Sequence, residues 1–128
     1  MEKSTLGKWL IFAGILLGIG VVAFALFGSG PKINWDQDIV YFYGDGCSHC
    51  EVLSKFLEDN KVAEKVPFQK LEVWKNLRNQ KLLMEAVKRC QIDTSAGGVG
   101  VPFVYARGKC FVGEVEATDF FKAEAGLQ

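Results

Sequence analysis

Twelve consecutive residues set the architecture expected of this chain: Ile39-Val40-Tyr41-Phe42-Tyr43-Gly44-Asp45-Gly46-Cys47-Ser48-His49-Cys50. The first five are β-branched or aromatic, which predicts a buried strand over residues 39–43. Gly44-Asp45-Gly46 ends that strand. Apolar residues then recur at helical spacing, namely Val52, Leu53, Phe56 and Leu57. A strand that turns directly into a helix indicates an α/β domain with two cysteines at the turn.

The rest of the chain predicts further elements of the same kind. We expect a strand over residues 67–74, a helix over 77–90, a glycine-rich loop over 94–100, strands over 102–105 and 110–112, and a last helix capped by Thr118 that ends at Ala125. The predicted order is β-α-β-α-β-β-α, with helical crossovers between the first three strands and a hairpin between the last two. About 95 residues can build this order only as a small three-layer sheet with helices on both faces.

An apolar run near the N-terminus predicts one transmembrane helix. Every residue over 9–27 is apolar or glycine, and about 20 such residues cross a bilayer. Lys3 and Lys8 precede the run and Lys32 follows it, which favours a cytoplasmic N-terminus. We therefore expect a single-pass protein of the cell membrane.

The predicted organisation is a cytoplasmic N-terminus (1–8), a transmembrane signal anchor (9–27), a linker (28–35) and an extracytoplasmic domain (36–128). The alternative is a cleavable signal peptide, whose apolar region usually spans only about 7–15 residues. Ala23-Phe24-Ala25 has the small-x-small pattern of a cleavage site, but it lies inside the apolar run. Its position favours the anchor.

The spacing of Cys47 and Cys50 predicts a redox-active dithiol. A cysteine that begins a helix meets unpaired backbone N–H groups and the helix dipole, which stabilise its thiolate. Cys50 lies one turn later on the same face. We therefore expect Cys47 to be the nucleophile and Cys50 the resolving cysteine of thiol–disulfide exchange.

His49 lies between the two cysteines, where a positive imidazole would stabilise the Cys47 thiolate further. A solvated residue without a catalytic role is the alternative. Asp45 would act in the opposite direction, because a carboxylate two residues before Cys47 disfavours the thiolate. The balance of these effects is not determined by the sequence.

A zinc site and a purely structural disulfide are the two alternatives for the cysteine pair. A structural zinc site usually needs a second close pair of cysteine or histidine ligands, and Cys90 and Cys110 are not such a pair. A purely structural disulfide would close a loop too short to remove much chain entropy. We expect no metal ligands and no cofactor.

Val101-Pro102 is the second informative motif. Proline has no N–H to donate and so opens a strand readily, and a glycine-rich segment precedes it. Both a cis and a trans Val101–Pro102 bond are compatible with the sequence, although trans is the more frequent form in general.

Together these motifs resemble the thioredoxin superfamily over about residues 36–125. The resemblance rests on residues 41–50, on Gly100-Val101-Pro102-Phe103 and on the Gly108-Lys109 turn. It implies a cis Pro102 beside the cysteine pair and a Val101 backbone that binds an extended substrate peptide. The element count is similar to glutaredoxins. The segment from Cys90 to Gly113 is similar to thioredoxin-like domains fused to vitamin K epoxide reductase homologues.

The chain departs from that family at three positions. Thioredoxins have tryptophan where Gly46 stands and a buried acid where Tyr41 stands. Gly113-Glu114 replaces the paired glycines with which glutaredoxins hold glutathione. In the implied fold Cys90 and Cys110 can approach each other, and either a second disulfide or two buried thiols is expected.

The predicted function is thiol–disulfide exchange on protein thiols and disulfides outside the cytoplasm, with a redox partner protein. One alternative is a non-catalytic binding module of the same fold, for a metal or a partner protein. Another is a glutaredoxin-like reductase that faces the cytoplasm. The chain has 15 basic and 15 acidic residues and a net charge of 0, so we expect no nucleic-acid partner.

Overall fold

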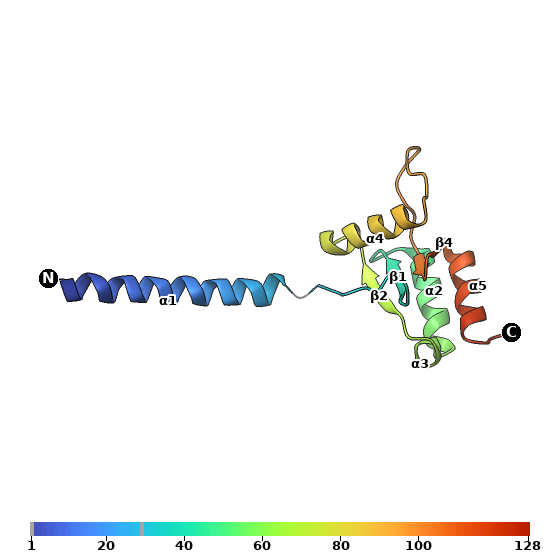
Figure 1. The fold of residues 1–128 in the computed structure, drawn as a ribbon. Coiled ribbons are helices and arrows are strands. Elements are labelled where there is room, and N and C mark those ends of the chain that lie inside the picture. The colour runs from blue at the N-terminus through green and yellow to red at the C-terminus, as the bar shows by residue number, and fades with distance from the viewer. Residues whose placement is uncertain (1, 29) are drawn as a thin grey trace. The chain divides into compact units, whose positions relative to one another are not determined.

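The computed structural model describes residues 2–28 and 30–128 (Figure 1). They form two compact units, one that ends at Lys32 and one that spans Ile33–Gln128. Each unit is considered by itself.

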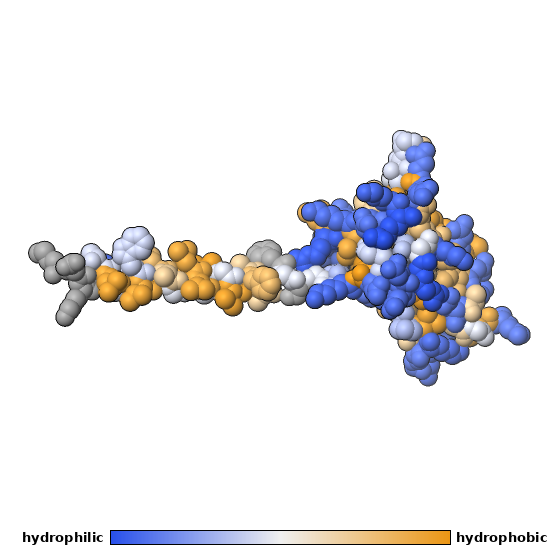
Figure 2. Space-filling view, in the orientation of Figure 1, coloured by the Kyte–Doolittle hydropathy of each residue, from blue (hydrophilic) through white to orange (hydrophobic). Residues whose placement is uncertain are grey.

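The first unit is the single long helix α1 (Glu2–Phe27). Its segment Thr5–Leu26 has 22 residues with a mean hydropathy of 2.6, and apolar side chains cover most of its surface (Figure 2). At 1.5 Å per residue this segment is about 33 Å long, which matches the hydrocarbon core of a bilayer. The helix therefore has the length and composition of a membrane anchor or of a signal sequence.

The second unit is a mixed α/β domain built on one sheet of four strands. In chain order its elements are β1 (Ile39–Tyr43), α2 (Ser48–Asp59), α3 (Val62–Lys65), β2 (Gln69–Glu72), α4 (Leu77–Arg89), β3 (Phe103–Ala106), β4 (Lys109–Val112) and α5 (Glu114–Glu124). The strand order is β2-β1-β3-β4. β1 pairs with β2 in parallel, whereas β1 with β3 and β3 with β4 are antiparallel.

The sheet separates two apolar cores, because successive side chains of a strand point to opposite faces. On one face Tyr41 and Val104 pack against α2, α3 and α5. On the other, Phe42 and Phe103 pack against α4. Helices therefore cover both faces of the sheet (Figure 1), and the three predicted layers are present.

The packed domain begins before residue 36. Ile33 and Trp35 pack against the core on the α4 side, and the Tyr105 hydroxyl donates a hydrogen bond of 3.0 Å to the carbonyl oxygen of Trp35. The Trp35 and Tyr105 rings also meet edge to face, 5.1 Å between centroids. These contacts fix the last residues of the predicted linker to the domain.

The start of the last helix was predicted wrongly. α5 begins at Glu114 rather than at Thr118, and its N-cap is Gly113 without a side-chain cap. Gly113 has a φ of 93°, a conformation that glycine adopts at little cost, and this turns the chain from β4 directly into the helix. The Glu116 carboxylate then accepts a hydrogen bond of 3.0 Å from the backbone N–H of Val112.

Two further features differ from the sequence prediction. The short helix α3 was not predicted, since its four residues are too few for a periodic pattern. β3 runs antiparallel to β1, whereas the predicted crossover implies a parallel strand. β3 lies inside the sheet, so Pro102 leads into an inner strand. It lies just before the first paired residue, where its missing N–H leaves the ladder intact.

Candidate functional site

Cys47 and Cys50 lie where β1 passes into α2. Cys47 is the N-cap of α2, and its sulfur accepts a hydrogen bond of 3.2 Å from the backbone N–H of Cys50. The two cysteines form a disulfide, with Cα atoms 5.2 Å apart. Cys47 is 7% exposed and Cys50 is 2% exposed. Both residues are thus buried, Cys47 slightly less so, and Cys47 is the one nearest the positive end of the helix.

Val101 and Pro102 lie beside this pair, although they are more than 50 residues away in the chain. The carbonyl oxygen of Val101 is 3.7 Å from the Cys47 sulfur, and the Val101–Pro102 bond is cis. The backbone N–H of Gly113 donates a hydrogen bond of 2.8 Å to the carbonyl oxygen of Pro102. The loop before β3 and the start of α5 thus meet at the disulfide.

The imidazole of His49 faces α5. Its Nδ1 lies 2.8 Å from Oε2 of Glu114, and its side chain is 70% exposed. Glu114 was noted in the sequence only as a replacement for glycine, and its pairing with His49 was not predicted. The side-chain partner of the His49 imidazole is therefore a carboxylate from the first turn of α5.

Tyr41 lies under the turn that carries Cys47 and Cys50. It occupies the position at which thioredoxins have a buried acid. It is fully buried, and its hydroxyl donates a hydrogen bond of 3.0 Å to the carbonyl oxygen of Cys50. Burial raises the pKa of Tyr41 to about 12, against a smaller lowering by its hydrogen bond with Ser54. A phenol with this pKa stays protonated near neutral pH, so Tyr41 holds the helix turn rather than accepting a proton.

Asp45 is paired with a cation that the sequence did not suggest. Lys75 forms an ion pair with Asp45, and this hydrogen bond and the lysine charge lower the pKa of Asp45. Glu72 completes the cluster by accepting hydrogen bonds from the backbone N–H groups of Asp45 (3.3 Å), Trp74 (2.7 Å) and Lys75 (2.9 Å). The Asp45 carboxylate is therefore paired with a lysine and is not an isolated negative charge before Cys47.

Trp74 packs on the backbone of the same turn. A Cβ atom at Gly44 would lie 2.3 Å from the Trp74 indole ring, so only glycine fits at this position. The indole remains half exposed. A tryptophan from the segment between β2 and α4 therefore lies beside the turn, although residue 46 itself is glycine.

Cys90 and Cys110 form the second disulfide, with Cα atoms 6.1 Å apart. Cys90 is the C-cap of α4, and Cys110 is in β4. Both pack against the core on the α4 side, whereas Cys47 lies at the N-terminus of α2 on the other face. The second disulfide fastens α4 to the sheet.

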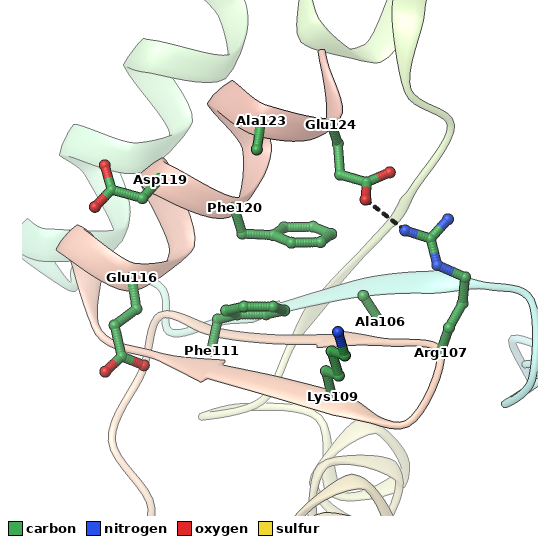
Figure 3. Close-up of a pocket in the computed structure, with 9 residues that line it drawn as sticks. All are labelled: Ala106, Arg107, Lys109, Phe111, Glu116, Asp119, Phe120, Ala123 and Glu124. Carbon is green, nitrogen blue, oxygen red and sulfur yellow. Dashed lines mark hydrogen bonds and ion pairs between the residues drawn. The ribbon is translucent and has the colours of Figure 1, made fainter. Parts of the chain in front are cut away.

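A hollow of about 540 Å³ is lined by Val101, whose carbonyl oxygen approaches the Cys47 sulfur. His49, Val101, Pro102, Val112, Glu114 and Val115 are among the residues that line it. A separate hollow between the β3–β4 hairpin and α5 holds the stacked rings of Phe111 and Phe120 and the ion pair of Arg107 with Glu124 (Figure 3). Its lining has no imidazole and no residue of the Val101-Pro102 segment, whereas the first hollow has both.

The structure thus brings together Cys47, Cys50, His49, Val101 and Pro102, all of which were predicted as site residues. Their neighbours include Tyr41 and Glu114, which the sequence marks only as departures from the family, and Lys75 and Trp74, which belong to no sequence motif. A comparison of the chain with protein-family models, curated proteins and solved structures found no match.

Proposed function

We propose that this protein is a membrane-tethered thiol–disulfide oxidoreductase of thioredoxin-like fold that acts on protein thiols and disulfides outside the cytoplasm. One observation carries the proposal: the Cys47–Cys50 disulfide begins α2, and the carbonyl oxygen of Val101 lies 3.7 Å from the Cys47 sulfur. This geometry supports a site in which Cys47 exchanges with a substrate, Cys50 resolves the mixed disulfide, and the backbone of Val101 binds an extended peptide.

The exchange proceeds in two displacements. A substrate thiolate attacks the Cys47 sulfur, an intermolecular S–S bond forms, and the Cys47–Cys50 bond breaks with Cys50 leaving as a thiolate. A second substrate thiolate then attacks the substrate sulfur of this mixed disulfide and releases Cys47. Two electrons pass from the substrate dithiol to the protein, and the two substrate protons end on Cys47 and Cys50. The reverse direction uses the same steps backward.

The surrounding residues support the role of Cys47 as the attacked and attacking sulfur. The N–H of Cys50 donates to it, and the positive end of α2 favours its thiolate over that of Cys50. Tyr41 holds the carbonyl group of Cys50. The resolving cysteine therefore stays fixed while Cys47 exchanges partners.

The tether is the apolar segment of α1, and the lysines before it favour an orientation with the domain outside the cytoplasm. Reporter fusions at each end of the chain test this orientation. An active periplasmic or extracellular reporter at the C-terminus, with an inactive one at the N-terminus, is the expected result. The opposite pattern would favour a glutaredoxin-like reductase that faces the cytoplasm.

The full chain in neutral detergent is the material for the activity test. We expect it to catalyse insulin reduction or oxidative refolding, and we expect Cys47→Ser to abolish the activity. Ser48→Ala changes an exposed side chain between the two cysteines and serves as the matched control. Full activity of Cys47→Ser would overturn the proposal. Stoichiometric zinc and no Cys47–Cys50 disulfide in protein purified without reductant would instead indicate a binding module.

A further inference from the structure

We infer that the hollow beside Cys47 selects substrate cysteines whose flanking residues are one apolar and one basic side chain. This inference rests on the proposed function and specifies its substrate class. It is carried by the walls and the charges of the hollow that lies between the loop before β3 and the first turn of α5.

The position of the hollow suits it to bind the substrate residues that flank a cysteine reacting with Cys47. Val101, whose carbonyl oxygen is 3.7 Å from the Cys47 sulfur, is part of its lining. A substrate sulfur bound to Cys47 therefore leaves its neighbouring residues over this hollow. The volume of about 540 Å³ is enough for one or two side chains.

The walls of the hollow are apolar and accessible. Pro102 forms its buried side, while Val112 and Val115 are 37% and 71% exposed. An exposed valine at the start of a helix has no packing role inside the domain. An apolar substrate side chain would cover it and remove both surfaces from water.

The charges of the hollow are negative. Glu114 and Glu116 both line it and both belong to the first turn of α5, where the helix dipole favours the ionised carboxylate. Among the described residues that line the hollow, there is no lysine or arginine. His49 brings at most one positive charge and is paired with Glu114, so the carboxylate of Glu116 is left for a cationic substrate group.

Three matched peptides that contain Val-Cys-Lys, Val-Cys-Gln or Val-Cys-Glu, with neutral flanks, test the inference. The reduced peptides react with the oxidised full chain in neutral detergent, and each rate is divided by the rate of the same peptide with a small neutral disulfide. This ratio removes the effect of the flanking charge on the peptide thiol itself. We expect the lysine peptide to react about fivefold faster than the glutamate peptide at low salt, and we expect the difference to shrink in 1 M salt.

Substitutions in α5 test whether Glu114 and Glu116 cause the preference for the lysine peptide. Glu116→Gln keeps an oxygen that accepts from the Val112 N–H and removes the charge, and it is expected to reduce the preference for lysine. Glu114→Gln with Glu116→Gln is expected to abolish it. Asp119→Asn removes a charge from the next turn of α5, outside this hollow, and is expected to leave the preference unchanged. Equal normalised rates for the three peptides, or a preference unaltered in the double variant, would overturn the inference alone. Failure of every peptide to exchange would overturn the proposed function as well.

Discussion

The hydroxyl of Tyr41 donates a hydrogen bond of 3.0 Å to the carbonyl oxygen of Cys50, and thereby links the buried strand β1 to the first turn of α2. Tyr41 is fully buried, and its hydroxyl also lies 3.4 Å from the Ser54 side chain. The contact fixes the backbone of Cys50 on the side of the turn that faces the core.

Removal of this hydroxyl should destabilise the domain. Tyr41→Phe keeps the ring and removes the donor, and we expect the free energy of unfolding to fall by about 1 kcal/mol. Tyr43→Phe, in a half-buried neighbour on the same strand, is the matched control and should change it less. Denaturant unfolding of the oxidised protein measures both. An unchanged midpoint for Tyr41→Phe would show that the hydrogen bond contributes nothing.

The same tyrosine predicts a loss of stability in strong alkali. The folded pKa of Tyr41 is raised to about 12 from 10.0, so the folded state disfavours the phenolate. Stability is therefore retained below pH 10 and falls by roughly 2 to 3 kcal/mol between pH 10 and pH 12. The difference in absorbance at 295 nm between the wild type and Tyr41→Phe should titrate near pH 12. A midpoint near 10 would contradict a buried phenol.

In the reduced protein, Lys75 should increase the fraction of Cys47 present as thiolate, because it neutralises the charge of Asp45. Lys75→Met leaves the Asp45 carboxylate without its cation, so the fraction of Cys47 present as thiolate at a fixed pH should fall. Asp45→Asn should raise it. Both groups are exposed, and the effect is therefore small; the absorbance of the thiolate at 240 nm measures it. A shift of the same sign in both variants would exclude an electrostatic origin.

The contact between Gly44 and Trp74 should be intolerant of a larger residue. Gly44→Ala puts a methyl group 2.3 Å from the indole, and we expect it to destabilise the domain by about 1–3 kcal/mol. Gly97→Ala, where a Cβ meets nothing within 4 Å, is the control. Combining Gly44→Ala with Trp74→Ala should recover most of the loss in thermal unfolding. No recovery would place the strain elsewhere in the turn.

The second disulfide should stabilise the fold without taking part in exchange. The Cys90–Cys110 bond spans 20 residues of sequence, and its replacement by two alanines should lower the free energy of unfolding by about 3 kcal/mol. Activity per folded molecule should be retained at temperatures well below the unfolding transition. Loss of activity in a fully folded double variant would assign this pair a redox role.

The local patterns were sufficient to predict most elements. β1 is found over residues 39–43 as expected, because an uninterrupted β-branched and aromatic run suits a strand that is buried on both faces. α4 ends within one residue of the prediction, since its apolar face repeats over three turns. The start of α5 was missed because the turn at Gly113 depends on backbone conformation, and Thr118 only resembled a cap.

By itself the sequence determined the apolar N-terminal helix, the α/β class of the domain and the position of the Cys47–Cys50 pair between a strand and a helix, because each depends on residues adjacent in the chain. Only the tertiary structure decided what surrounds that pair. The pairing of His49 with Glu114 joins residues 65 positions apart, and Asp45 meets Lys75 across 30. Such contacts follow from how the helices pack on the sheet, and no local pattern encodes them.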